Sequence, residues 1–437
     1  MIAELKPYPE YKDSNLPWLG KIPKHWEEKR AKCYFREVDE RSKTGNEELL
    51  SVSHITGVTP RSQKNITMFK AESYAGYKTC KPGDLAINTM WAWMGALGVS
   101  KYSGIISSGY AVYRPIRVVD YVPDFIDHLL RIPPYTSEFF CRSTGIRSSR
   151  FRLYPDKFLK IPIIYPPREE QEEIITFLNR ENQKINRYIQ AKNRLIEILN
   201  ERKQVIVSNA VTRGIDPNVR CVPSGIDWLG DIPEHWEFIK MKYLFTERVQ
   251  KGYPDQPLLA ATQVKGVVPK NLYEHRTVTA SKDLHLLKLV KEGDFVISLR
   301  SFQGGIEYAF FRGIISPAYT ILEPTTTINT DYFRLLFKTH IFIENLSFFV
   351  TGIREGQNID YQKLKQAFLP LPPKEEQKII ADYTLKNTEA LDSAITKYYN
   401  EIRLVQEYQT RLITETITGK MDVRNVKLEI NVNHKMC

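Results

Sequence analysis

The densest group of side chains able to bind phosphates or bases lies at residues 142–152. This stretch reads Arg142-Ser-Thr-Gly-Ile-Arg147-Ser-Ser-Arg150-Phe-Arg152, and its glycine and serines favour a loop. Arginine presents a fixed fork of donors that matches both guanine edges and phosphate oxygens. A solvated turn whose arginine fixes the backbone is the ordinary alternative. The pattern predicts nucleic-acid contacts from Arg142, Arg147, Ser148, Arg150 and Arg152.

A parallel loop follows about 207 residues later. It reads Thr351-Gly-Ile-Arg354-Glu-Gly-Gln357-Asn358, with one arginine and two amides, which suit adenine edges. Two loops that share a frame and differ in polar side chains are what two different base targets would require. The predicted contacts of this loop are Arg354, Gln357 and Asn358.

A second pair of candidate loops is Asn88–Gly95 and Ser298–Gly304. The first carries Trp91 and Trp93, which could stack on bases or wedge between them, although tryptophans are as often part of a core. The second carries Arg300 and Gln303. We count these four side chains as candidate DNA contacts.

No catalytic or cofactor motif is complete. Ile132-Pro-Pro-Tyr135 lacks the Asp or Asn that an adenine methyltransferase places before its Pro-Pro-aromatic sequence, and Gly419-Lys420 lacks the rest of a P-loop. The eight histidines and five cysteines form no metal-ligand cluster. The sequence therefore predicts a non-catalytic chain that binds no cofactor or metal itself.

Membrane and secreted classes are also disfavoured. The most apolar stretch, Ala86–Val99, is too short to cross a bilayer, and the first residues carry no apolar signal region. Five scattered cysteines favour a reducing cytoplasm.

The elements that position these loops occur twice. WLGKIPKHW at 18–26 returns as WLGDIPEHW at 228–236, and PPREEQ at 166–171 returns as PPKEEQ at 372–377. The Lys-x-Gly-Asp, Gly-Ile-Ile-Ser and Thr-Gly-Ile-Arg segments repeat in the same order between them. The chain is therefore one module used twice. The tryptophan-rich segment is predicted to clamp each globular part to a helix, with His25 and His235 in structural roles.

Each module combines a globular part with a long helix. Short β-branched and aromatic runs predict an α+β domain, and about 45 residues without proline or glycine then run to Gly214 or Gly419. We expect the two helices to pair as an antiparallel coiled coil; pairing with a partner or a second copy is the alternative. The predicted seam residues are Ile185, Ile189, Ile196, Leu199, Ile206, Leu391, Ile395, Ile402, Val405 and Leu412.

The resulting division has four segments with unequal charge. They are a first domain at 1–165, a central helix at 166–220, a second domain at 221–371, and a C-terminal helix and tail at 372–437. The net charge is +11, and residues 1–165 hold 25 basic and 17 acidic side chains, a net +8. Such a surplus favours a polyanionic partner, with salt-dependent contacts mainly in the first domain.

Together, the repeated WLGxIPxHW, KxGD, TGIR and PPxxEQ motifs resemble the specificity subunit of type I restriction–modification systems over nearly the whole chain. The resemblance implies two target-recognition domains, each reading half of a bipartite, gapped double-stranded DNA site. It implies that the helices set the gap and dock two methyltransferase (modification) subunits, together with restriction subunits that translocate and cleave DNA. S-adenosylmethionine, ATP and Mg would be bound by those partners. A specificity subunit of a combined nuclease–methyltransferase, or a stand-alone DNA-binding regulator, would carry the same sequence motifs. The resemblance implies no particular target sequence or gap length.

Overall fold

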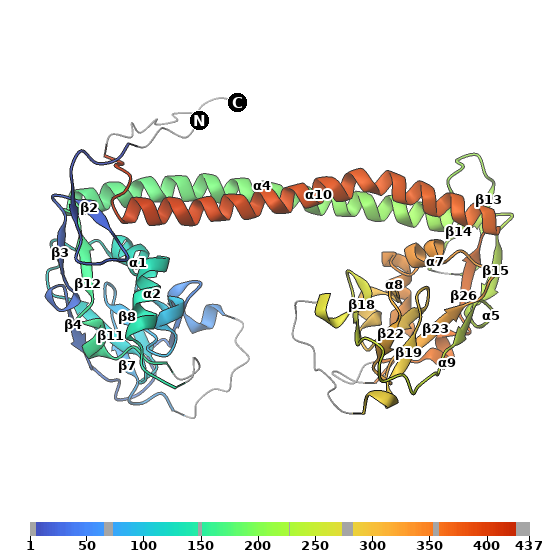
Figure 1. Ribbon diagram of the computed structural model, residues 1–437, viewed down its shortest axis with the longest axis horizontal. Helices are drawn as coiled ribbons and strands as arrows, with labels where there is room; N and C mark the ends of the chain where they lie inside the picture. Colours follow the sequence, from blue (N-terminus) through green and yellow to red (C-terminus); the bar gives the residue numbers. More distant parts are fainter. Residues whose placement is uncertain are drawn as a thin grey trace. The chain divides into compact units, whose positions relative to one another are not determined.

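The computed structural model describes residues 6–64, 73–146, 151–226, 228–272, 283–352 and 358–424. These residues form two compact units (Figure 1). One unit comprises residues 1–191 with 401–437, and the other comprises residues 192–400. Each unit holds one globular head and part of both long helices, so we describe the units separately. We call the globular parts the first head and the second head.

The first head is built from short antiparallel strands and three short helices. Its central sheet has four strands in the order β4-β11-β8-β9, and the remaining strands pair in twos. The elements are β1 Tyr11–Asp13, β2 Lys21–Pro23, β3 Glu27–Arg30, β4 Phe35–Val38, β5 Leu50–Ser53, β6 Gly57–Pro60, β7 Lys78–Cys80, β8 Leu85–Ile87, β9 Leu97–Val99, β10 Gly104–Ile106, β11 Ala111–Pro115, α1 Pro123–Arg131, α2 Pro133–Arg142, α3 Pro155–Phe158 and β12 Pro162–Tyr165.

The core of this head lies between the central sheet and the helices α1 and α2. Helix α1 begins with proline at its first position, as helices tolerate, and buries four side chains on one face. Those residues pack with aromatic side chains of the sheet and of α2, including Phe35, Tyr135 and Phe139, all of which are fully buried. Aromatic groups thus form a large part of this core beside its aliphatic side chains.

The second head repeats this plan. Its central sheet has the order β16-β23-β20-β21, strand for strand the equivalent of the first. The elements are β13 Cys221–Pro223, β14 Asp231–Pro233, β15 Glu237–Lys240, α5 Met241–Leu244, β16 Phe245–Glu247, β17 Leu259–Thr262, β18 Gly266–Pro269, β19 Lys288–Val290, β20 Phe295–Ile297, α6 Ser301–Gly304, β21 Glu307–Tyr308, β22 Gly313–Ile315, β23 Thr320–Pro324, α7 Thr330–Leu336, α8 His340–Leu346, β24 Val350–Thr351, β25 Asn358–Ile359, α9 Tyr361–Leu364 and β26 Phe368–Leu371.

The two long helices are α4, Arg168–Arg213, and α10, Lys374–Ile417. Each starts directly after a Pro-Pro pair and ends before a glycine with positive φ, 76° at Gly214 and 72° at Gly419. These are the boundaries that the sequence predicted, because proline suits the start of a helix and glycine adopts the left-handed conformation that ends one.

Within each unit α4 and α10 pack side by side and run in opposite directions. In the first unit Gln409 donates to Asn182 over 2.9 Å, and the Tyr188 hydroxyl donates to Glu401 over 3.0 Å. Since the residue number falls along α10 as it rises along α4, the pair is antiparallel.

The second unit shows the same arrangement. The ammonium of Lys203 bonds Asp392 over 2.6 Å, and that of Lys192 lies 4.1 Å from the ring centre of Tyr398. All ten predicted seam residues are buried or half-buried.

The predicted fold class, two similar α+β domains with paired long helices, is confirmed. The residue bounds of the four sequence segments remain predictions. Helix α7 ends at Leu336. The Thr339 side chain then accepts from the Phe342 amide and begins α8. Among the described residues, no helix is long and apolar enough to cross a membrane.

Candidate nucleic-acid interface

A buried polar junction joins the first head to the start of α4. The Trp26 indole donates to Glu170 Oε1 over 3.1 Å, and His25 Nε2 lies 2.7 Å from Glu170 Oε2. The Tyr8 hydroxyl donates to the same carboxylate. In the second unit Trp236 donates to Glu376 over 3.1 Å, and His235 lies 2.8 Å from it. The repeated tryptophan-rich segment therefore clamps each head to its helix, as the sequence predicted.

The glutamine next in sequence completes each junction. Gln171 accepts from the Val122 amide over 3.2 Å and donates to the Pro166 carbonyl over 2.9 Å. Gln377 accepts from the Asn329 amide over 2.8 Å and donates to the Pro372 carbonyl over 2.8 Å. Both residues of the Glu-Gln pair are thus explained by hydrogen bonds that fix the head against the helix.

The two ends of the described chain meet at the first junction. The Asp422 amide donates to the Lys6 carbonyl over 2.8 Å, and the Arg424 guanidinium lies 4.9 Å from the ring centre of Tyr8. In the second unit the corresponding stretch is the continuous segment between α4 and β13. In the first unit, non-covalent contacts between the two ends of the described chain therefore take the place of the continuous backbone found in the second unit.

The Lys-x-Gly-Asp turns before β8 and β20 carry a buried carboxylate each. Asp84 accepts from both Nε and Nη2 of Arg114, on β11, at 2.8 and 2.9 Å. Asp294 accepts from Arg248, which instead follows β16, at 3.0 and 3.1 Å. These ion pairs hold the start of the strand that leads into each of the loops 88–95 and 298–304.

The loop after β8 presents Trp91 and half-buries Trp93. Trp91 is 45% exposed, whereas the Trp93 indole donates to the Met90 carbonyl over 3.1 Å and its ring packs on Phe140. The two indoles stack with centroids 6.0 Å apart. Of the two tryptophans, Trp91 therefore has the surface that a nucleic-acid base could reach, and Trp93 supports it.

The arginine-rich segment differs from the predicted continuous loop at its start. Arg142 is the last residue of α2 and pairs with Glu138 one helical turn earlier, so the i, i+4 ion pair extends the helix to this point. Arg152 is exposed, and its amide donates to the Thr144 carbonyl over 3.0 Å. Arg147, Ser148 and Arg150 lie outside the described residues.

The structure brings the two candidate loops of the first head together. The Leu153 amide donates to the Thr89 carbonyl over 2.9 Å. Phe140, at the end of α2, stands edge-on to both Trp93 and Phe151, with centroids 6.1 and 5.3 Å apart. Trp91 and Arg152 therefore belong to neighbouring segments of one surface.

The second head places its candidates on equivalent elements. Arg300 and Gln303 are exposed at the one-turn helix α6, and Asn358 is exposed on β25, which packs on α6. Arg354 and Gln357 lie outside the described residues. The second head has no described aromatic pair at the positions of Trp91 and Trp93, so the two surfaces differ in chemistry while sharing a frame.

A buried ion pair beside this surface had no signal in the sequence. Lys338 donates to Glu307 Oε1 over 2.7 Å, and burial raises the pKa of Glu307 to about 7 although the ammonium opposes that rise. Glu307 sits on β21 and Lys338 follows α7, so only the fold makes them neighbours. Their spacing of 31 residues has no periodicity that would have revealed the pair.

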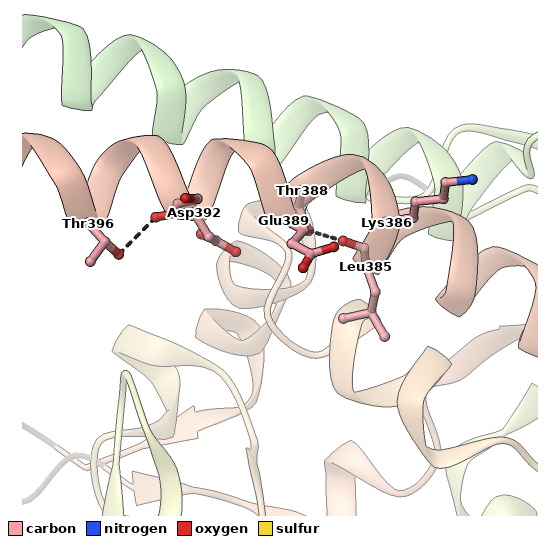
Figure 2. A pocket seen from close by; sticks show the side chains of 7 residues that line it. Leu385, Lys386, Thr388, Glu389, Asp392 and Thr396 are labelled. Atoms are coloured by element: carbon pink, nitrogen blue, oxygen red, sulfur yellow. Dashed lines mark hydrogen bonds between the residues drawn. The ribbon is translucent and has the colours of Figure 1, made fainter.

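A groove in the second unit offers no catalytic arrangement. It runs along one face of α10 and is lined by Leu385, Lys386, Thr388, Glu389, Asp392, Ser393 and Thr396 (Figure 2). The Thr388 and Thr396 hydroxyls bond backbone carbonyls of their own helix, and Asp392 bonds Lys203. Among the residues placed by the structure, no group of three or more His, Cys, Asp or Glu could hold a metal ion.

Comparisons with known proteins give relatives over nearly the whole chain. The chain is 25% identical to the putative type I restriction enzyme MjaX specificity subunit of Methanocaldococcus jannaschii, over 95% of this chain and 98% of the relative. It is 26% identical to the MjaVIII specificity subunit of the same organism, over 65% of this chain and 67% of the relative. No family model matches. The chain is thus similar over nearly its whole length to a type I specificity subunit.

A solved structure supports the fold of this specificity-subunit homologue. A chain from a structure of a type I R-M system, reported for its complex assembly and conformational transition, matches with a TM-score of 0.62. The match covers 92% of this chain and 99% of that chain at 15% identity. The structural match bears on the fold, and the resemblance stated from the repeated motifs is confirmed by the two relatives named as specificity subunits.

Proposed function

We propose that this specificity-subunit homologue is the DNA-binding subunit of a type I restriction–modification complex, with each head reading one half of a bipartite, gapped site. The observation that carries the proposal is the duplicated module with unlike surfaces. The tryptophan and histidine contacts of Glu170 are repeated at Glu376, whereas the exposed side chains at Trp91 and Arg300 differ. A shared frame with different polar and aromatic groups suits two different base targets.

The fixed pairing of α4 and α10 supports a bipartite site. Two weak half-site contacts on one chain reinforce each other, because binding of the first raises the effective concentration of the second. In this proposal the gap between half-sites is set by the length of the helix pair. The surplus of basic groups in residues 1–165 would make the first half-site the more salt-sensitive one.

The chemistry belongs to partner subunits in this proposal. Modification subunits, two by the symmetry of the duplicated module, would bring S-adenosylmethionine and methylate adenine; restriction subunits would bring ATP and Mg for translocation and cleavage. The chain itself would act in the cytoplasm as a non-catalytic subunit. Its relatives' names support that role, since each is called a specificity subunit.

The test is a map of methylated adenines in cells with and without this gene, by single-molecule sequencing. We expect one bipartite motif that disappears when the gene is deleted and returns with a plasmid copy. A motif that persists in the deletion strain contradicts the proposal. Tight, specific DNA binding by the purified chain with no gene-dependent methylation would instead indicate a stand-alone regulator, and co-purification with a single fused nuclease–methyltransferase would indicate the related combined system.

A further inference from the structure

Each head carries the same tight hairpin turn at one edge of its fold. The turn between β5 and β6 is residues 54–56, and the turn between β17 and β18 is residues 263–265. We call these two turns the tips. In both hairpins the next residue is a glycine with positive φ, 63° at Gly57 and 72° at Gly266. Three-residue turns closed by a left-handed glycine are well-defined hairpins, so the tips have a fixed backbone.

A cation from the helix behind holds the first tip. Arg131, the last residue of α1, donates through Nη2 to the carbonyl oxygens of His54 and Ile55 over 2.6 and 3.0 Å. Its Nη1 is 3.3 Å from Asp127, which fixes the guanidinium in turn. The backbone of the tip is therefore anchored from the protein side, and its side chains are left to face outward.

The second tip is held in the same way by a different cation. Lys338, after α7, donates to the Gln263 carbonyl over 3.2 Å and to the Gly304 carbonyl over 2.7 Å. One ammonium thus ties the tip to α6, which carries the candidate contacts Arg300 and Gln303. The two heads keep the anchoring function while exchanging arginine for lysine.

Hydroxyl groups complete both turns. The Ser53 side chain accepts from the Thr56 amide over 3.2 Å, and Lys64 donates to the Thr56 hydroxyl over 2.8 Å. In the second head the Thr262 side chain accepts from the Lys265 amide over 2.9 Å. These bonds add rigidity within the turn and place an ammonium group beside the first tip.

The central residue of each tip is an aliphatic side chain in water. Ile55 is 75% exposed and Val264 is 94% exposed. A β-branched aliphatic residue favours a strand and gives no benefit to a solvated turn, where glycine, asparagine or serine would serve. The same mismatch at the equivalent position of both heads points to a contact made outside the chain.

Both tips lie beside the candidate loops that follow β8 and β20. His54 lines one cavity together with Met94 and Gly95 of the loop after β8, and the other side of this cavity is formed by residues of α1, α2 and α10. In the second head the side chain of Gln263 packs on Gly304, where an added Cβ would come within 2.7 Å of it. Each tip therefore contacts the loop that carries the candidate residues of its own head.

From this we propose that the tips are a third DNA-contacting element, in which Ile55 and Val264 touch apolar base edges in the first and second half-sites. The C5-methyl group of thymine is the apolar feature that a base edge presents in the major groove. No carboxylate occurs within residues 53–57 or 262–266, and Lys64 and Lys265 at the tips suit phosphates rather than an acidic protein. This inference rests on the proposed function.

The experiment uses the full chain co-expressed with its modification subunits, with Ile55→Thr and Val264→Thr as variants that keep the β-branched shape. Val119→Thr is the matched control, because Val119 is 78% exposed in the first head but lies in a different loop. Methylated motifs are sequenced in cells, and the purified complexes are titrated against the wild-type motif and against DNA with deoxyuridine replacing each thymine in turn. Thermal unfolding verifies that each variant folds.

We expect Ile55→Thr to weaken binding about five- to tenfold, or to relax the motif, at a first-half-site position only, and Val264→Thr to act only on the second half-site. Deoxyuridine at the contacted thymine should weaken the wild type and leave the variant unaffected. Unchanged motifs and affinities in both variants overturn the inference. A variant that no longer binds its modification subunits, while its own affinity for the motif is unchanged, overturns it as well. Absence of any motif with the unaltered chain overturns the proposed function as well, which keeps the two failures distinct.

Discussion

The Trp26 indole and the Glu170 carboxylate, joined over 3.1 Å, form the same bond that Trp236 and Glu376 form in the second unit. The two carboxylates differ in burial, however. The Glu170 side chain is 5% exposed and also accepts from Tyr8, while the Glu376 side chain is 24% exposed. The same hydrogen bond is therefore buried in the first unit and partly accessible to water in the second.

We predict that Glu170→Ala destabilises the first unit more than Glu376→Ala destabilises the second. The first change leaves the buried Trp26 and Tyr8 donors without their acceptor, which costs about 1–3 kcal/mol for each buried group left unpaired. The second leaves one tryptophan donor at a site that water can reach. Hydrogen exchange of α4 and α10, read separately at Glu170 and Glu376, measures each junction.

A matched control is Glu172→Ala, since Glu172 lies two residues further along α4, is exposed, and forms a surface ion pair with Arg168. Such a surface pair contributes little to stability. Equal loss of protection in the Glu170 and Glu376 variants would contradict the role assigned to burial.

The repeat made most of the fold predictable. Prolines, glycines and apolar spacing located both long helices, because those signals act within one element. The prediction that the arginine-rich loop begins at Arg142 was wrong. The ion pair between Arg142 and Glu138 stabilises the last turn of α2, and its contribution is comparable to the preference of the serines and glycine for a loop. The contact between Lys338 and Glu307 was invisible, since it depends on how separate elements pack.

We predict that Glu307 makes the second head less stable as the pH rises. Its pKa is raised to about 7 by burial, from an ordinary value near 4.5, so the folded state binds the proton more tightly than the unfolded state. Stability contributed by this group is therefore present below about pH 4.5 and is lost as pH rises towards 7. The loss amounts to about 3 kcal/mol, since each unit of displaced pKa is worth about 1.4 kcal/mol.

The variant Glu307→Gln should remove this loss. We expect the second head of the variant to be about as stable as the wild type near pH 5 and more stable at pH 8, where the wild type carries a buried charge. Hydrogen exchange or urea unfolding at both pH values gives the slope, and Glu292→Gln, which changes an acidic residue in the turn before β20, is the control. Identical slopes in wild type and Glu307→Gln would show that Glu307 titrates normally.

We predict that the stacked tryptophans of the first head separate into two roles. Trp91→Ala should leave thermal stability nearly unchanged and weaken DNA binding by about 1–3 kcal/mol, because the exposed indole is the one that a base can reach. Trp93→Ala should cost about 2–4 kcal/mol of stability, since it removes the packing on Phe140 and the bond to the Met90 carbonyl. Calorimetry and DNA titration of the assembled complex distinguish the two outcomes.

The site was less predictable than the fold for a physical reason. Exposure of Trp91 and half-burial of Trp93 follow from where the loop folds back onto α2, and both residues look alike in the sequence. No sequence motif marks the hairpin tips. Ile55 and Val264 are residue types common in strands, and only the folded turn shows that they are exposed to water. Only the packing of these loops on the head decides which side chains remain available for binding.

We predict that one heptad added to both long helices widens the gap between half-sites without changing either half-site. The insertions belong after Tyr188 in α4 and before Glu401 in α10, because the hydrogen bond between these two residues marks facing positions of the antiparallel pair. Seven residues preserve the seam, since the apolar repeat is close to seven. The gap should increase by about three base pairs, from roughly 10 Å of added helix at 1.5 Å per residue, and methylated-adenine sequencing reads it directly. A seven-residue insertion in α4 alone shifts the pairing register and should abolish methylation; an unaltered gap in the double insertion would show that the helix pair does not set the spacing.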